Sequence, residues 1–221
     1  MKTIDSLRQN VIDVAQALPK FGLVWMAGGT ICAHDPETGY VVVTPSGMAY
    51  DNLRSEDMIV TDMAMNVIDG THRPSVALNL WTGFFKARPD LHAIVHTHSP
   101  FATAFAVIGE PIPIVTETQA NWFGSPIPVT PYLSVDDERF STLPIELLGQ
   151  GFGLLLGQHG VITLGADLDA ALERAVTLEE AARTYSIAKT IGNPLNFSEE
   201  MARNSFNYYH HEYGQNHKDS E

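Results

Sequence analysis

Two histidines separated by one residue, His96 and His98, end the apolar stretch LHAIVHTH. Alternate side chains of a β-strand point to the same face, so we expect both imidazoles on one side of the strand. Two neutral imidazoles on one face can share a divalent metal ion. We expect His159 in GQHG to be the third ligand, because it stands at a break between two apolar segments and its flanking glycines let the backbone turn. Three protein ligands leave coordination positions open, which is typical of catalytic metal sites.

The competing interpretation of this pair is a half-buried set of hydrogen-bonded histidines without a metal. The position of the pair at the end of an apolar run favours the metal site, since unpaired polar rings would be costly to bury there. The other histidines are interpreted individually as surface or tail residues: His34, His72, His92, His210, His211 and His217.

The segments around the histidines have to hold them in place. We expect a helix over about 4–18, two strands joined by a turn at DPETG, a helix over about 75–87, a strand over 91–98 and a helix over 100–109. Two apolar strand segments flank His159. A long amphipathic helix then runs over 167–191, with Ile187 and Ile191 on its apolar face and Gly192 as its end. Interleaved strands and helices predict the α/β class, and the hairpins favour a mainly antiparallel sheet.

Composition predicts one globular domain, because 221 residues with 44% hydrophobic and 18% charged positions can bury a sizeable core. The formal net charge of −13 argues against nucleic acid or an anionic membrane as a partner. No apolar run approaches the ~20 residues of a membrane span, and we expect no export signal. A single cysteine, Cys32, excludes an intrachain disulfide, so we expect a reducing, cytoplasmic compartment.

Several segments together resemble the class II aldolase/adducin family, and most closely its L-ribulose-5-phosphate 4-epimerase branch. They are LPKFGLVWMAGGTICAHD, YVVVTPSGMAYDNLRSEDMIVTDMAMNVIDG, RPDLHAIVHTHSPFATAFAVIGEPIPIV, LLGQHGVITLG and YYHHEYGQ, in the order of the family. The doublet HTHS with a later HG is the most specific of these marks. The resemblance places a class II aldolase/adducin-like domain at residues 1–215 and a polar tail at 216–221.

This resemblance implies a central, mostly antiparallel sheet flanked by helices, and a C4 homotetramer with active sites at subunit interfaces. It implies a divalent metal, usually zinc, held by His96, His98 and His159, although imidazole ligands also suit manganese and other first-row ions. The chemistry implied is retro-aldol cleavage of a small ketose or ketose phosphate through a metal-stabilised enediolate. An aldolase releases the fragments, whereas an epimerase rotates the aldehyde and closes the bond again.

The resemblance also implies six substrate-binding residues, which are Gly28, Gly29, Ser46, Gly47, Ser75 and Asn121. Several of these positions depart from the family pattern. Ala77 stands where the family has an acidic residue, Asn121 where the epimerase branch has an aspartate, and Thr44 where the family has a lysine before PSG. For proton transfer two candidates remain. Glu117 aligns with the tyrosine donor of the fuculose-phosphate aldolase branch, and Tyr213 with the tyrosine of the epimerase branch.

Two other functions stay open at this point. A family decarboxylase or dehydratase would act on a related keto acid or ketose, and the loss of the acidic residue at Ala77 favours it. A noncatalytic, adducin-like assembly module is the second, and the retained histidine triad argues against it. The departures near Thr44 leave both phosphorylated and free sugars as substrates, with Arg73 as a further cation.

Overall fold

The computed structural model describes residues 4–214, and within them seven strands form one sheet. The strand order is β4-β3-β2-β1-β5-β7-β6, and every neighbouring pair is antiparallel. The strands are β1 (Gly29–Asp35), β2 (Tyr40–Val43), β3 (Ile59–Asp62), β4 (Val67–Asp69), β5 (Ala93–Thr97), β6 (Gly153–Leu156) and β7 (Gly160–Gly165). The predicted α/β fold with a mostly antiparallel sheet is therefore confirmed.

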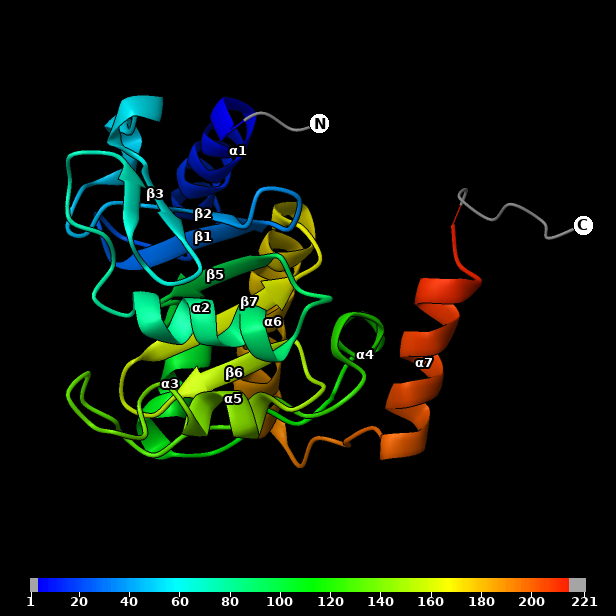
Figure 1. The fold of residues 1–221 in the computed structure, drawn as a ribbon. Helices are drawn as coiled ribbons and strands as arrows, with labels where there is room; N and C mark the ends of the chain where they lie inside the picture. The colour runs from blue at the N-terminus through cyan, green and yellow to red at the C-terminus, as the bar shows by residue number, and fades with distance from the viewer. Residues whose placement is uncertain (1–3, 215–221) are drawn as a thin grey trace, which may run out of the picture.

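Helices cover both faces of this sheet, as Figure 1 shows. They are α1 (Ile4–Ala17), α2 (Leu78–Ala87), α3 (Pro100–Ile108), α4 (Glu117–Phe123), α5 (Leu143–Leu148), α6 (Leu168–Ile191) and α7 (Glu199–His211). Residues of α1 and α6 share one buried cluster with one face of β1 and β5, and residues of α2 and α5 share a second cluster with the other face. A third cluster joins α3, α4 and α6, and α7 packs mainly on α4 at the margin of the molecule.

The alternation of buried side chains explains how one strand serves both layers. Ile31 and Val95 belong to the cluster under α1 and α6, whereas Cys32 and Ile94 belong to the cluster under α2. Cys32 is fully buried and pairs in register with Val43 on one side and Ile94 on the other. Burial raises the pKa of its thiol. The centre of the sheet is thus covered on both faces.

Two predicted boundaries differ from the structure. Helix α2 begins at Leu78 and not at 75, because the Ser75 hydroxyl accepts a hydrogen bond from the Ala77 amide and holds the preceding residues as a turn. Helix α6 has the predicted extent, but Ile187 and Ile191 are 47% and 81% exposed. Placing these two on the buried face was wrong, since that end of the helix carries mostly exposed residues.

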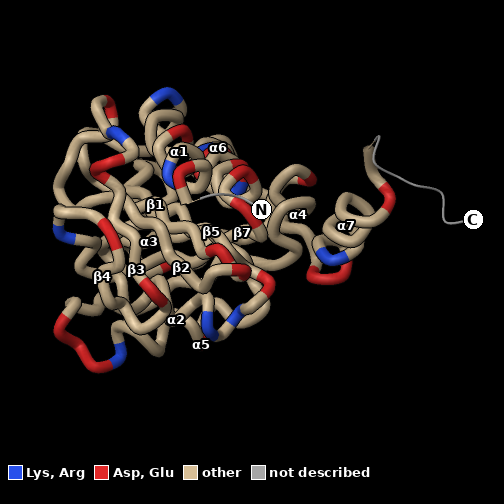
Figure 2. Tube along the Cα trace, turned by 45° about the horizontal axis from the view of Figure 1, so that its top comes forward, with Lys and Arg blue, Asp and Glu red and all other residues tan. Residues whose placement is uncertain are grey.

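Five elements lie outside the segments that we predicted as helices or strands: β3, β4, α4, α5 and α7. The predicted tail at 216–221 and His217 lie outside the described residues. Acidic side chains outnumber basic ones, 26 to 13 in the whole chain, and are spread widely along the described trace (Figure 2). Among residues 4–214, none of the helices is both long and apolar enough to cross a membrane.

Candidate metal centre

Three histidines from two separate parts of the chain converge at one end of β5. The ring centroids of His96 and His98 lie 5.0 Å apart, those of His96 and His159 4.9 Å, and those of His98 and His159 5.1 Å. One ring nitrogen of each lies within 4.8 Å of the others, so the triad can hold a metal ion. Such a set of three is found nowhere else among the His, Cys, Asp and Glu residues of the described chain.

The three rings run from the interior to the surface. His96 is buried, His98 is half-buried and His159 is exposed. An ion held between them would be anchored in the protein on one side and open to solvent on the other. This arrangement leaves room for a substrate, as in catalytic metal sites.

A strained turn between β6 and β7 presents His159. Gln158 has a left-handed φ of 55°, which is uncommon for a residue other than glycine, and its amide donates to the carbonyl of Ala106, 3.0 Å away. A Cβ on Gly157 would lie 2.3 Å from the carbonyl oxygen of Thr130. Only glycine permits this approach, and the turn that aims His159 depends on it.

Gly160 brings β7 close to the other two histidines. A Cβ at this position would lie 2.5 Å from the carbonyl oxygen of Thr97 and 2.6 Å from Cδ2 of His98. The glycine of the HG doublet therefore lets β7 pair with β5 while the ring of His98 lies against the backbone.

The orientation of His96 is fixed by the neighbouring strand. Its Nδ1 donates a hydrogen bond to the carbonyl oxygen of Val161 at 2.8 Å. This bond places the hydrogen on Nδ1 and leaves Nε2 with a lone pair, which is the arrangement usual for a metal-ligating histidine. The ring also contacts the indole of Trp81, with centroids 5.5 Å apart.

His98 supplies a direct test of whether a metal fits. Its Nε2 is buried and makes no hydrogen bond to any described residue. A buried polar atom without a partner costs free energy, and native structures rarely leave one unexplained. A divalent ion shared with the other two rings would give this nitrogen the partner that it lacks. The three donor atoms therefore fit a metal ion.

The protonation of the triad also suits metal binding. Burial, together with the neighbouring His159 and His98, lowers the pKa of His96 to about 3. Burial lowers the pKa of His98 too, and partial desolvation of the ring followed by the proximity of His98 lowers that of His159. All three rings are therefore neutral near pH 7, and only a neutral imidazole ligates a metal.

A cavity of about 170 Å³ adjoins the triad. Four of the predicted substrate-binding residues line it, namely Gly29, Ser46, Gly47 and Ser75. Gly28 lies beside it, since a Cβ there would come within 3.3 Å of Nδ1 of His98. The remaining wall is mostly apolar and includes Val76, Ala77, Trp81, Val135, Phe140 and Leu156.

Three other predicted site residues are not brought to this cavity within one chain. Glu117 is the exposed first residue of α4, and Asn121 lies in the same helix. Tyr213 follows α7, is 62% exposed and stacks on Tyr209 with ring centroids 5.3 Å apart. None of the three lines the cavity, so their catalytic and binding roles stay predictions that require a second copy of the chain.

Glu179 stabilises the segment next to the triad, and its role was not predicted from the sequence. Its two carboxylate oxygens accept hydrogen bonds from the amides of Phe101 and Ala102, each at 2.9 Å. The side chain thus caps α3, which begins two residues after His98, and the residue is only 7% exposed. A glutamate four residues after Ala175, and therefore on the apolar face of a long helix, was the available signal.

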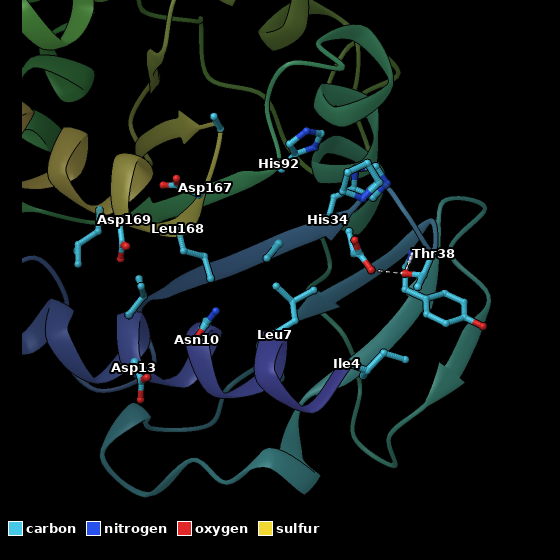
Figure 3. Close-up of a pocket in the computed structure, with 17 residues that line it drawn as sticks. Ile4, Leu7, Asn10, Asp13, His34, Thr38, His92, Asp167, Leu168 and Asp169 are labelled. Carbon is cyan, nitrogen blue, oxygen red and sulfur yellow. Dashed lines mark hydrogen bonds between the residues drawn. The ribbon is translucent and has the colours of Figure 1, made fainter. Parts of the chain in front are cut away.

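A larger cavity, of about 400 Å³, lies at the opposite end of β5, between α1, the β1–β2 turn and the start of α6 (Figure 3). His34 and His92 line it, with ring centroids 5.6 Å apart and each Nδ1 buried without a described partner. Interpreting these two as surface residues was wrong, because both are half-buried beneath this hollow. The triad does not reach it, so size alone does not identify the reactive site.

The fold and the triad together define an α/β protein of the class II aldolase type with a site able to hold a divalent metal. The chain belongs to the family described as Class II Aldolase and Adducin N-terminal domain, whose model matches residues 9–186. Among solved structures it is similar to an L-fuculose 1-phosphate aldolase, with 25% identity, a TM-score of 0.88 and coverage of 92% of this chain and 95% of the other.

Two further structures are similar. YgbL of Klebsiella pneumoniae, described as a candidate aldolase/epimerase/decarboxylase, has 25% identity, a TM-score of 0.81 and coverage of 91% and 98%. The L-fuculose 1-phosphate aldolase from Glaciozyma antarctica PI12 has 24% identity, a TM-score of 0.78 and coverage of 93% and 84%. At this identity the last likeness concerns the fold alone.

Proposed function

We propose that this protein is a metal-dependent enzyme that breaks or re-forms a carbon–carbon bond of a small hydroxy-carbonyl compound by retro-aldol chemistry. The observation that carries the proposal is the triad of neutral histidines beside a small cavity, in a chain of the class II aldolase family. In a noncatalytic scaffold without a metal, the buried Nε2 of His98 would be left without a partner, which argues against that function. The metal is proposed to be zinc, with manganese or another first-row ion as substitutes.

The proposed roles of individual residues are metal binding, substrate orientation and exclusion of water. His96, His98 and His159 hold the ion, and the bound ion supplies Lewis-acid polarisation of a carbonyl and the adjacent hydroxyl. The hydroxyl of Ser46 at the cavity wall orients the substrate. Trp81 closes the inner side of the cavity against His96 and excludes water from it.

Proton transfer needs a group that the single chain does not place in the cavity. No residue that lines it, within the described chain, carries a carboxylate or a phenol. We propose that the chain assembles as a homotetramer in which Glu117 or Tyr213 of a neighbouring copy reaches the cavity and moves the proton. Both side chains are exposed and available for such a contact.

Two alternatives differ from an aldolase in the products that they release. The similarity to YgbL keeps decarboxylation of a keto acid as the second candidate, and the uncharged Ala77 in the cavity wall favours it by leaving the site without an acidic ligand. An epimerase of the L-ribulose-5-phosphate 4-epimerase type would use the same residues and return every carbon to the product.

One experiment tests the proposal. The purified protein is analysed for bound metal, loaded with zinc or manganese, and incubated with a panel of free and phosphorylated ketoses and keto acids. We expect equimolar metal and either aldehyde release or an isomer with all carbons retained. Carbon dioxide without aldehyde would assign the decarboxylase alternative. Protein that binds no metal through the triad would refute the proposal.

A further inference from the structure

A chain of hydrogen bonds between side chains forms one wall of the cavity beside the triad. Its members are Trp81, Ser75 and Thr30, and all three line the cavity. Trp81 Nε1 donates to Ser75 Oγ at 3.1 Å, and Ser75 Oγ lies 3.3 Å from Thr30 Oγ1. Which of the two hydroxyl groups donates in the second contact decides what this wall offers to a ligand.

The bonds made by Ser75 determine the answer. A hydroxyl group has two lone pairs that accept and one hydrogen that it can donate. Both lone pairs of Ser75 Oγ are used, because Trp81 Nε1 donates to it at 3.1 Å and the Ala77 amide at 3.3 Å. The contact with Thr30 must therefore use the hydrogen of Ser75, and Thr30 Oγ1 is the acceptor.

Thr30 consequently keeps its own hydrogen for another acceptor. Its Oγ1 has no hydrogen-bond partner besides Ser75 among residues 4–214. The residue is only 6% exposed, and buried donors in native proteins rarely stay without an acceptor. Because Thr30 lines the cavity, the acceptor for this hydrogen has to come from the molecule that occupies the cavity.

The pairing of β1 with β5 places Thr30 next to the triad. Thr30 stands directly opposite His96 in the register of these two strands. Side chains of opposite residues in an antiparallel pair lie on the same face, with Cβ atoms roughly 4.5–5.5 Å apart. Trp81, the first member of the chain of bonds, contacts the ring of His96. The hydrogen of Thr30 is thus offered on the face where the metal is proposed to bind.

The direction of the bonds also strengthens Thr30 as a donor. Two N–H groups donate to Ser75, and Ser75 in turn donates to Thr30. Successive hydrogen bonds in one direction polarise one another, so the last hydroxyl group of the series is the best donor. Such a fixed donor favours an oxygen atom that carries or gains negative charge during a reaction.

We propose that Thr30 determines substrate specificity by donating a hydrogen bond to an oxygen atom of the bound hydroxy-carbonyl compound. Ser75 and Trp81 are positioning residues that fix the direction of this bond. The inference rests on the proposed function and deepens it by adding a residue to the site. Thr30 is not among the six substrate-binding residues that the family resemblance implies.

The test measures the affinity of zinc-loaded protein for glycolohydroxamate, a small chelating probe, by isothermal titration calorimetry. Thr30→Val replaces the hydroxyl group by a methyl group, and we expect binding to weaken by about fivefold or more. Thr30→Ser keeps the hydroxyl group and should bind within about twofold of the wild type. Thr61→Val makes the same exchange at a buried residue of β3 whose Oγ1 has no described partner, so it is the matched control and should bind normally. The zinc content of all three variants should equal that of the wild type.

A double-mutant cycle tests the direction of the bonds. Trp81→Phe removes the N–H group that occupies one lone pair of Ser75, so that Thr30 can donate to Ser75 and no longer to the ligand. We expect this change to weaken probe binding by about threefold or more in the wild-type background. The loss should be much smaller in Thr30→Val, which has no hydrogen to redirect. Equal losses in the two backgrounds would overturn the assigned direction.

The outcomes separate the inference from the proposed function. Unchanged affinity in Thr30→Val overturns the inference and leaves the metal enzyme intact. Binding as weak in Thr30→Ser as in Thr30→Val also overturns it, because the hydroxyl group would not be the cause. Loss of zinc from Thr30→Val would show a structural role and contradict the inference as well. Failure of the zinc-loaded wild type to bind the probe overturns the proposed function together with the inference.

Discussion

The Nδ1 hydrogen of His96 is bonded to the carbonyl oxygen of Val161, 2.8 Å away on the neighbouring strand. The ring proposed to ligate the metal is thereby tied to the pairing of β5 with β7, in which Thr97 stands opposite Val161. Metal binding and the geometry of this strand pair should therefore respond together to mutation.

Removing one ring of the triad is expected to remove the metal without unfolding the chain. His98→Ala deletes a half-buried ligand whose Nε2 has no described partner, so little native bonding is lost with it. We expect near-zero metal by plasma mass spectrometry, no turnover, and an unchanged circular dichroism spectrum. His72→Ala, at an exposed residue paired with Asp57, serves as the control and should keep its metal. Equimolar metal in His98→Ala would remove the triad from the mechanism.

Substitution of Gly160 is expected to damage the site and the fold together. In Gly160→Ala the new Cβ would overlap the Thr97 carbonyl and the His98 ring, so β7 must move away from β5. We expect a loss of about 1–3 kcal/mol in the free energy of unfolding, typical of overpacking, and weaker zinc binding. Gly192→Ala is the matched control, because its Cβ would meet nothing within 4 Å and its φ of −179° suits any residue.

Glu179 is expected to influence metal affinity from a distance. In Glu179→Gln the amide group turns a donor toward the Phe101 or Ala102 amide, and one cap of α3 is lost. We expect a decrease of about 1–3 kcal/mol in the free energy of unfolding and a lower zinc affinity in a chelator competition assay. Glu180→Gln on the same helix loses only an exposed pair with Arg183, which contributes little. Identical affinities in the two variants would restrict Glu179 to a role in stability.

Glu117 is expected to affect the rate and not the metal. If a neighbouring copy supplies this carboxylate, Glu117→Gln should lower kcat by about 100-fold or more, the usual size of a general acid–base contribution, at full metal occupancy. The control is Glu110→Gln, an exposed residue beyond α3. An unchanged rate would transfer the proton to Tyr213 or to water.

The metal-free protein is expected to lose stability as the pH falls below neutral. His96 has its pKa lowered from 6.5 to about 3 in the folded chain, so the unfolded chain binds more protons between these values. Stability is therefore full above pH 6.5 and declines as the pH falls toward 3, by up to about 1.4 kcal/mol per pH unit for each such group. Urea unfolding in the presence of a chelator at pH 7, 6 and 5 measures the slope, which should be shallower in His96→Asn. A slope unaffected by this substitution would contradict the assignment.

Much of the metal centre could be predicted from the sequence because its signals are local. The alternation of a strand places His96 and His98 together, and glycines on either side of Gln158 and His159 indicate a turn. The register between β5 and β7, which brings His159 to the pair, is a long-range property that the sequence did not specify by itself.

What the sequence could not predict depends on tertiary contacts. The carboxylate of Glu179 reaches amides more than seventy residues away, and no local pattern reveals that pairing. Helix α7 is polar on average and has Ala202 as its only fully buried residue, and no helix was predicted there. The half-buried His34 stacks on Phe85 of α2 with ring centroids 5.4 Å apart and lies 5.6 Å from His92, and these contacts join distant parts of the chain.

The single thiol at the middle of the sheet can be used as a probe of how often the core opens. Cys32 lies on β1 with its side chain buried in the cluster under α2, so a reagent such as Ellman's can reach its sulfur only when this layer lifts from the sheet or the sheet itself opens. Its labelling rate therefore measures the frequency of opening at the centre of the sheet. Mutants that merely fail to hold zinc would be labelled as slowly as the native chain, whereas those with a loosened interior would be labelled faster.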